Sequence, residues 1–69
     1  MQIQVTNKLG YIRESKGISQ EQLGWKSHVS RHTISEIELD RRNQSVRTAL
    51  LLAKALECTV EDIFKIEEK

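Results

Sequence analysis

Four polar residues near the middle of the chain have the types and spacing needed to hydrogen-bond a large partner. On a helix of 3.6 residues per turn they fall on the side away from the apolar Ile34 and Ile37. An arginine can donate two hydrogen bonds to guanine, and hydroxyl, imidazole and carboxylate groups can serve neighbouring bases. Such a set can read base edges in the major groove of DNA, although an ordinary solvent-facing helix is equally polar. The four residues are Arg31, His32, Ser35 and Glu36.

Metal binding and catalysis are the competing chemistries, and the spacing argues against both. His28 and His32 stand four residues apart, as two ligands of one metal ion can on a helix. However, Val29 follows His28 where a metalloprotease helix needs glutamate, and His28 falls in a predicted turn. Cys58 is the only cysteine, and no nucleophile has a base beside it. We therefore expect no enzymatic activity, no metal site and no cofactor.

A reading helix needs a second helix to hold it, and the residues before it predict one. Ser19 lies three residues before Gln22, a capping-box spacing that predicts a helix over about residues 20–27. Ser30 is the expected N-cap of the reading helix, which we predict over about residues 31–39. Two short helices joined by a tight turn, the second with a polar outer side, form a helix-turn-helix motif.

A further helix is predicted on the N-terminal side of this pair. It covers about residues 7–15, with Leu9 and Ile12 facing inward and Tyr11 as a further candidate for the inward side. Gly17 follows it, where a helix C-terminus favours a residue free to take a positive φ.

Two more helices are predicted on the C-terminal side, after a loop over residues 40–44. Ser45 is the expected cap of the first of them, and Thr59 with Asp62 forms a capping box for a short last helix through Phe64. The fold class is therefore mainly α, with five helices. The helix after Ser45 has a broad apolar stripe made of Val46, Ala49, Leu50, Leu52, Ala53 and Leu56.

Both ends of the chain alternate polar and apolar residues, as half-buried strands do. Residues 2–6 and 64–67 have this pattern. They could pair as a small antiparallel ribbon beside the helices, but a lone ribbon is marginal in water, so frayed ends are an equal alternative.

Length and charge limit the function classes further. The 69 residues suit one domain, 1–69, without a membrane span or a secretion signal. A single thiol fits a reducing compartment, so we expect a cytoplasmic protein. Residues 26–47 hold five Lys or Arg side chains against three carboxylates, whereas residues 57–69 hold five carboxylates against two lysines. This polarity suggests one basic face for phosphates, although an ordinary solvated surface would fit as well.

Four stretches in order make the chain similar to a known family. They are Arg13 with Gly17-Ile18-Ser19-Gln20-Glu21-x-Leu23, then Val29-Ser30-Arg31-x-Thr33-Ile34-Ser35-x-Ile37-Glu38, then Leu52-Ala53-x-Ala55-Leu56, and Val60-Glu61-Asp62-Ile63-Phe64. The run from 9 to 64 resembles the Cro/C1-type, or xenobiotic-response-element-type, helix-turn-helix family. With strand-like ends it resembles most closely the small dimeric cytolysin-repressor-like subgroup.

The resemblance implies a lambda-repressor-like five-helix domain that acts as a homodimer on double-stranded DNA at a two-fold operator, most often as a repressor. By position, it assigns base reading to the four residues of the polar helix. It implies an ion pair of Arg13 with Glu38. Phosphate contacts fall on Gln20, Ser30 and Thr33, and we add Arg41 and Arg42 with their neighbour Asn43.

Four positions depart from the family pattern. His28 stands where a turn glycine is usual, and histidine tolerates positive φ better than most residues. Gly24 replaces a common alanine and would allow two helices to approach closely. Leu39 and Gln44 replace a glycine and a proline, which leaves the path of the loop open.

A dimer is also suggested by the small size of the chain and by apolar residues near its end. Those residues could equally be plain core. The functional alternative is a protein-interaction module or antitoxin-like partner on the same scaffold, which an apolar outer side of the third helix would have favoured. No small-molecule effector is evident. The candidate interface residues are Leu51, Cys58, Val60, Ile63 and Ile66.

Overall fold

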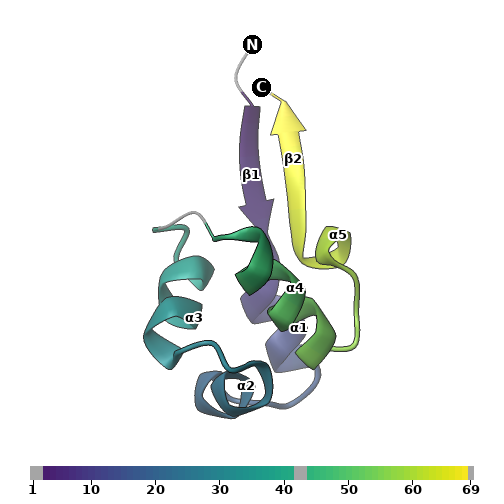
Figure 1. Ribbon diagram of the computed structural model, residues 1–69. Helices are drawn as coiled ribbons and strands as arrows, with labels where there is room; N and C mark the ends of the chain where they lie inside the picture. The colour runs from purple at the N-terminus through teal and green to yellow at the C-terminus, as the bar shows by residue number, and fades with distance from the viewer. Residues whose placement is uncertain (1–2, 42–43, 69) are drawn as a thin grey trace.

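The computed structural model describes residues 3–41 and 44–68, which form five helices and a two-stranded antiparallel ribbon (Figure 1). The predicted fold class is confirmed, and the ribbon forms rather than fraying. The elements are β1 (Ile3–Asn7), α1 (Leu9–Ser15), α2 (Gln20–Ser27), α3 (Arg31–Glu38), α4 (Val46–Ala55), α5 (Val60–Ile63) and β2 (Phe64–Glu68).

Capping boxes begin two of the helices where the sequence predicts them. Ser19 Oγ accepts from the backbone N–H of Gln22 at 3.0 Å, and Gln22 Oε1 accepts from the backbone N–H of Ser19 at 2.8 Å. Thr59 and Asp62 make the same reciprocal bonds at the start of α5. Each box satisfies backbone donors that a helix leaves unpaired in its first turn, so both starts are set locally.

Three predicted boundaries are wrong by one or two residues. The first helix begins at Leu9 rather than at Asn7, because Asn7 is the last residue of β1. The reading helix ends at Glu38, with Leu39 as its C-cap. Phe64 has extended backbone and opens β2, so α5 ends one residue earlier than expected.

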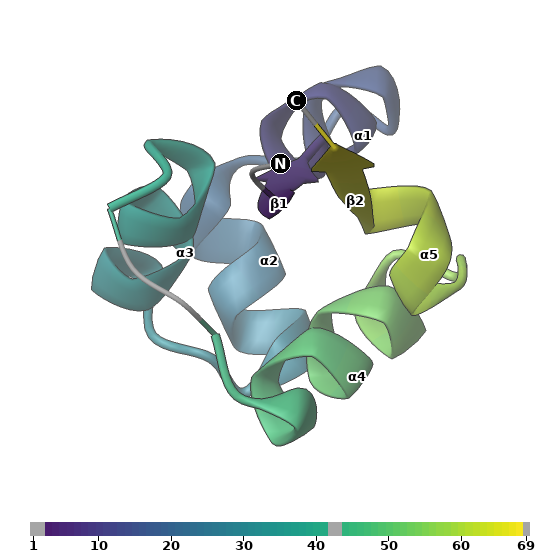
Figure 2. The same ribbon diagram turned by 90° about the horizontal axis from the view of Figure 1, so that it is seen from above.

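The core lies between the helices, and α2 closes the end of the helical body that is opposite the ribbon (Figures 1 and 2). The predicted stripe on α4 is too broad, since the exposed fractions of Val46 and Leu50 are 77% and 57%. Both lie at the edge of the stripe, away from the buried Ala49, Leu52 and Ala53. Tyr11 also points outward. The core cluster is Leu9, Leu23, Val29, Ile34, Ile37, Leu52, Ala53, Leu56 and Ile63.

The predicted dimer-interface residues fall into different environments. Ile63 is fully buried within its own chain, so it belongs to the core. Its prediction as a dimer-interface residue is therefore wrong. Leu51, Cys58 and Val60 are half-buried and pack against the core cluster. Ile66 is exposed on β2. Only the last four can therefore contact another molecule without unfolding the chain.

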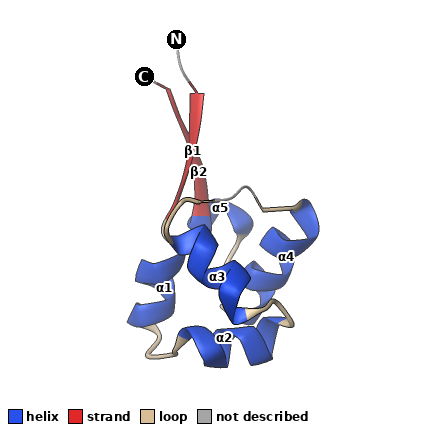
Figure 3. Cartoon of the chain, turned by 90° about the vertical axis from the view of Figure 1, so that its left-hand side faces the viewer, coloured by secondary structure: helices blue, strands red, loops and turns tan. Residues whose placement is uncertain are grey.

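The ribbon projects from the helices, and its base is bonded to the end of α3 (Figures 1 and 3). In its register Val5 lies opposite Ile66, and Asn7 lies opposite Phe64. The side-chain amide of Asn7 donates to the carbonyl of Ile37 at 3.0 Å and to the carboxylate of Asp40 at 2.6 Å. Asn7 Oδ1 accepts from the backbone N–H that opens α1. One side chain thus joins β1, α1 and α3.

Candidate nucleic-acid interface

The turn between α2 and α3 is closed by bonds from three consecutive residues. His28 ends α2 in the left-handed region, with φ of 61°, and its N–H donates to the carbonyl of Gly24 at 2.9 Å. The buried Ser27 hydroxyl donates to the carbonyl of Leu23 at 2.7 Å and accepts from the N–H of Val29 at 3.2 Å. These bonds occupy polar groups that burial would otherwise leave unpaired, so the turn has a defined shape.

The N-terminus of α3 begins with a side-chain cap. Ser30 Oγ accepts from the backbone N–H of Thr33 at 3.1 Å and bonds Thr33 Oγ1 at 2.8 Å. Gly24 lies beside this start, since a Cβ on it would stand 3.0 Å from the carbonyl oxygen of Val29. The expected close approach of the two helices is therefore present, and it depends on the missing side chain.

Arg13 and Glu38 form the ion pair implied by the family pattern. Arg13 Nε lies 2.8 Å from Glu38 Oε2, and Arg13 Nη2 lies 3.2 Å from Glu38 Oε1. Arg13 Nη1 also donates to the carbonyl of Ile18 at 2.9 Å. The side chains of Arg13 and Glu38 are only 11% and 13% exposed. The hydrogen bond to Glu38 raises the pKa of the Arg13 guanidinium, against the opposing effect of desolvation.

Gln20 joins the same cluster from the first position of α2. Its Nε2 donates to Glu38 Oε1 at 3.0 Å. The amide nitrogen carries a second hydrogen, so this bond leaves a donor for a phosphate oxygen. Glu38 therefore holds α1 and α2 against the C-terminal end of α3.

The four residues assigned to base reading share the outer side of α3. Arg31 and His32 are exposed, whereas Ser35 and Glu36 are half-buried. Two shallow hollows meet at Arg31. One, of about 270 Å³, is lined by Gln20, Arg31, His32 and Ser35. The other, of about 310 Å³, is lined by Arg13, Ser19, Gln20, Glu21 and Arg31.

His32 and Glu36 are also neighbours along the helix. His32 Nε2 lies 3.5 Å from Glu36 Oε1, one helical turn away. The sequence shows this i,i+4 spacing, yet the pairing was not among the predictions. The two side chains therefore lie together on one part of the outer side of α3.

The path of the loop after α3, which the sequence left open, turns at Asp40. Asp40 has a φ of 57°, whereas Leu39 has a φ of −90°. Arg41 is exposed beside it. Arg42 and Asn43, the other predicted phosphate partners, lie outside the described residues. The side chain of Asp40 accepts a hydrogen bond from the side-chain amide of Asn7, which ties this loop to the base of the ribbon.

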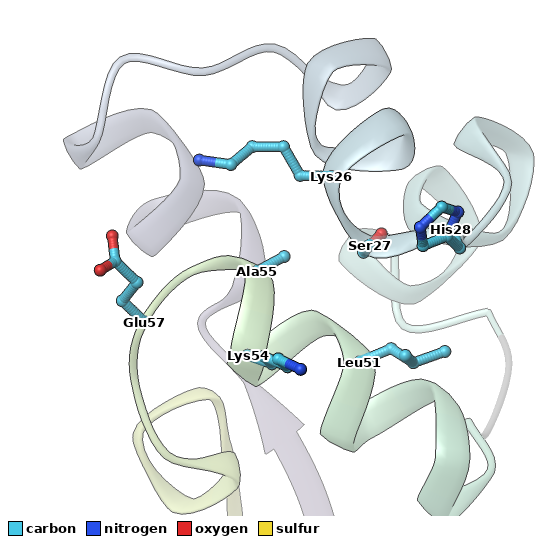
Figure 4. A pocket seen from close by; sticks show the side chains of 7 residues that line it. All are labelled: Lys26, Ser27, His28, Leu51, Lys54, Ala55 and Glu57. Atoms are coloured by element: carbon cyan, nitrogen blue, oxygen red, sulfur yellow. The ribbon is translucent and has the colours of Figure 1, made fainter.

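A further hollow of about 380 Å³ lies away from α3, between the end of α2 and α4 (Figure 4). The basic side chains around it are Lys26, His28 and Lys54, with Glu57 at one edge and Leu51 on its floor. No residue pattern in the sequence predicted it, because it joins two helices distant in the chain. Burial raises the pKa of the nearby Cys58 thiol, so it stays protonated at neutral pH.

The described residues offer neither a membrane-spanning helix nor a metal site. Within residues 3–41 and 44–68, no helix is long and apolar enough to cross a membrane. The same residues hold no cluster of three or more metal-ligating side chains.

Two short helices, a left-handed turn and a braced polar outer side define a helix-turn-helix protein. The family model described as helix-turn-helix matches residues 9–63. The chain belongs to the Cro/C1-type helix-turn-helix family of DNA-binding transcriptional regulators.

Relatives of the chain are described as transcriptional regulators or as a repressor. The chain is 40% identical to an uncharacterized HTH-type transcriptional regulator of Methanocaldococcus jannaschii, over 90% of this chain and 94% of the relative. It is 38% identical to the uncharacterized HTH-type transcriptional regulator YgzD of Bacillus subtilis, over 91% and 96%. The competence pilus inhibition repressor of Acinetobacter baylyi is 36% identical over 84% of this chain, which spans 53% of that protein.

A solved structure has the same fold. The restriction-modification controller protein C.AhdI from Aeromonas hydrophila is similar with a TM-score of 0.75 and 35% identity. The match covers 78% of this chain and 82% of the controller protein.

Proposed function

We propose that this protein is a transcriptional repressor that binds a palindromic DNA operator as a homodimer in the cytoplasm. The observation that carries the proposal is the outer side of α3, where Arg31, His32, Ser35 and Glu36 are held by a buried cluster behind them. An α-helix fits the major groove, and its first turn reaches the base edges. One relative, the competence pilus inhibition repressor, supports repression rather than activation of transcription.

Phosphate contacts are proposed on both sides of this helix. Gln20 has a free amide hydrogen at the start of α2, and Ser30 with Thr33 lies at the start of α3. Arg41 is exposed at the other end of α3, followed in the chain by Arg42 and Asn43. These groups would set register and affinity, because phosphate contacts carry no sequence information of their own.

The homodimer is supported by apolar surface that one chain leaves uncovered. Val5 and Ile66 lie opposite each other in the ribbon and are both exposed, and Leu51, Cys58 and Val60 are half-buried. A two-fold dimer would place its reading helices about 34 Å apart, one turn of DNA, so the operator would be a near-palindrome.

Selection of bound sites from a random DNA pool, at two salt concentrations, tests the proposal. We expect a near-palindromic site and an affinity that falls as salt rises. Sedimentation with and without the selected DNA measures the stoichiometry. A monomer in both conditions, or a selected site without two-fold symmetry, would refute the homodimer.

Two arginine variants separate base reading from phosphate binding. Arg31→Ala should flatten the preference at one base pair of each half-site. Arg41→Ala should lower the affinity for all DNA sequences alike. It should also reduce the slope of log affinity against log salt concentration by about one. Lys65→Ala removes the same charge from the ribbon, at the other end of the molecule from α2, and is the matched control (Figure 1). Equal effects from all three variants would contradict the assignment.

A further inference from the structure

The carboxylate of Glu36 is incompletely hydrogen-bonded on the reading side of α3. Its Oε1 lies 3.5 Å from His32 Nε2. Its Oε2 is buried and has no hydrogen-bond partner among residues 3–41 and 44–68. The side chain as a whole is 26% exposed, so rotation about its side-chain torsions would bring the carboxylate to the surface. A buried polar atom without a partner is costly and uncommon, and for an ionised group the cost is larger.

Docking on DNA would make this shortage of donors worse. Groove water is displaced, and the phosphates nearby carry the same sign of charge as Glu36. A donor on a base edge would then satisfy the carboxylate directly. In the major groove these donors are the amino groups of cytosine and adenine, whereas guanine O6 and N7 and thymine O4 are acceptors.

Cytosine fits a carboxylate better than adenine does. Adenine presents the N7 acceptor beside its amino group, so the second carboxylate oxygen would face another acceptor. Cytosine presents its amino group without a neighbouring acceptor on the same base edge. An ionised glutamate, which has no donor of its own, therefore selects cytosine.

We propose that Glu36 sets the base choice of each half-site by requiring a cytosine amino group. His32 is then its positioning residue and does not read a base of its own, as the family pattern implies it would. This inference rests on the proposed function, in which α3 enters the major groove. The imidazole of His32 lies one turn before Glu36 and restricts where the carboxylate can turn. Glu36 thus excludes wrong sites as well as binding the right one. With guanine or thymine at that position, an acceptor on the base would face the carboxylate, which is also an acceptor.

Site selection with Glu36→Gln is the sharpest test. Glutamine can bond both N6 and N7 of adenine, so the variant should select adenine where the wild type selects cytosine, with other positions unchanged. Glu61→Gln, the same chemical change on α5, is the matched control and should select the wild-type site. The inference is overturned if Glu36→Gln selects the same base as the wild type. A wild type that selects no site at all refutes the proposed function itself.

A change to the DNA base tests the same contact without a new hydrogen-bonding side chain in the protein. The selected cytosine is replaced by a 2-pyrimidinone base, which lacks only the amino group. We expect the wild type to lose about tenfold in affinity and Glu36→Ala to lose little, because the alanine has no carboxylate to satisfy. Equal losses for the two proteins would overturn the inference.

His32→Ala distinguishes positioning from base reading. As a positioning residue, His32 should affect the cytosine preference at the Glu36 position and leave every other base preference as it is. A variant that instead flattens a different base pair would show that His32 reads a base itself, and would overturn its assignment as the positioning residue.

Discussion

Gln20 Nε2 donates to Glu38 Oε1 over 3.0 Å, which bonds the first residue of α2 to the last residue of α3. The bond crosses the helix-turn-helix motif at the end opposite to the turn, and Glu38 is at the same time bonded to Arg13. Rotation of α3 against α2 would therefore break a charge-assisted hydrogen bond as well as core packing.

Gln20→Ala should weaken DNA binding more than it destabilises the chain. The lost hydrogen bond to a charged group corresponds to about 1.5–3 kcal/mol of stability. The same variant also loses the proposed phosphate contact, so the loss in affinity should exceed the loss expected from unfolding alone. Urea unfolding and DNA titration on one preparation measure both, and Gln4→Ala on the ribbon is the control. Unchanged affinity in a folded variant would rule out the phosphate role.

Each of the single variants Arg13→Met and Glu38→Leu should lower the free energy of unfolding by more than the double variant does. Either single change leaves a charge unpaired in a nearly buried site, which costs about 3–5 kcal/mol. The double variant leaves no unpaired charge and loses only the hydrogen bonds to Gln20 and to the carbonyl of Ile18. Urea unfolding of the wild type, both single variants and the double variant forms a double-mutant cycle. Additive losses would show that the pair contributes no coupling.

The helix starts could be predicted because their bonds are local. The Ser19 and Gln22 pair and the Thr59 and Asp62 pair each satisfy backbone groups three residues away, so spacing alone reveals them. The alternation at both termini likewise predicted strands, although whether they pair depends on the rest of the fold. The contact between Arg13 and Glu38 could be predicted only from the family pattern. The two residues are 25 positions apart, so no local spacing indicates that they meet.

Contacts that depend on the packing of distant segments could not be predicted in the same way. Val46 and Leu50 belong to an apolar stripe in the sequence, but which part of it faces α2 is decided by the other helices. The loop after α3 turns at Asp40, which has a left-handed backbone and is bonded to Asn7 at the base of the ribbon. No residue near position 40 signals that partner.

His28→Gly should stabilise the chain while leaving DNA binding intact. His28 holds φ of 61°, where a side chain is strained and glycine is not, so a gain of about 0.5–1 kcal/mol is expected. Lys26→Gly, two residues earlier within α2, should instead lose about 1 kcal/mol because it lowers helix propensity. Thermal unfolding compares the two. A destabilised His28→Gly would mean that the imidazole contributes contacts that outweigh the backbone strain.

Gly24→Ala should fail to stabilise α2, although alanine is the better helix former by about 1 kcal/mol. Its Cβ would stand 3.0 Å from the backbone carbonyl of Val29, which cannot turn aside as a side chain can. The start of α3 must move to make room, so both unfolding free energy and DNA affinity should fall. Trp25→Ala, at an exposed neighbouring position, controls for a change within α2. A more stable Gly24→Ala variant would show that the turn yields easily.

Stability should fall in acid partly through Asp62. The pKa of this carboxyl lies below its usual 3.8, first because the backbone N–H of Thr59 donates to it and then because the Thr59 side chain does. A carboxyl with a lowered pKa in the folded state stabilises it above the unfolded value, and the effect is lost as pH falls from 3.8 through the folded value. Asp62→Asn should therefore be less stable than the wild type near neutral pH, with the difference shrinking below pH 3.8.

Thr59→Ala tests the same effect in part, because it removes the hydroxyl that helps to lower the pKa of Asp62 and keeps the backbone N–H that donates to the carboxylate. The hydroxyl also accepts from the backbone N–H of Asp62, so the variant loses that cap at every pH. Its acid-induced loss of stability should lie between those of the wild type and Asp62→Asn. Urea unfolding at pH 7 and at pH 3 measures the three proteins. Since the capping box opens α5 and α5 precedes β2, circular dichroism of the ribbon should follow the same order. A wild type and Asp62→Asn that differ equally at both pH values would exclude this carboxyl as a source of the acid sensitivity.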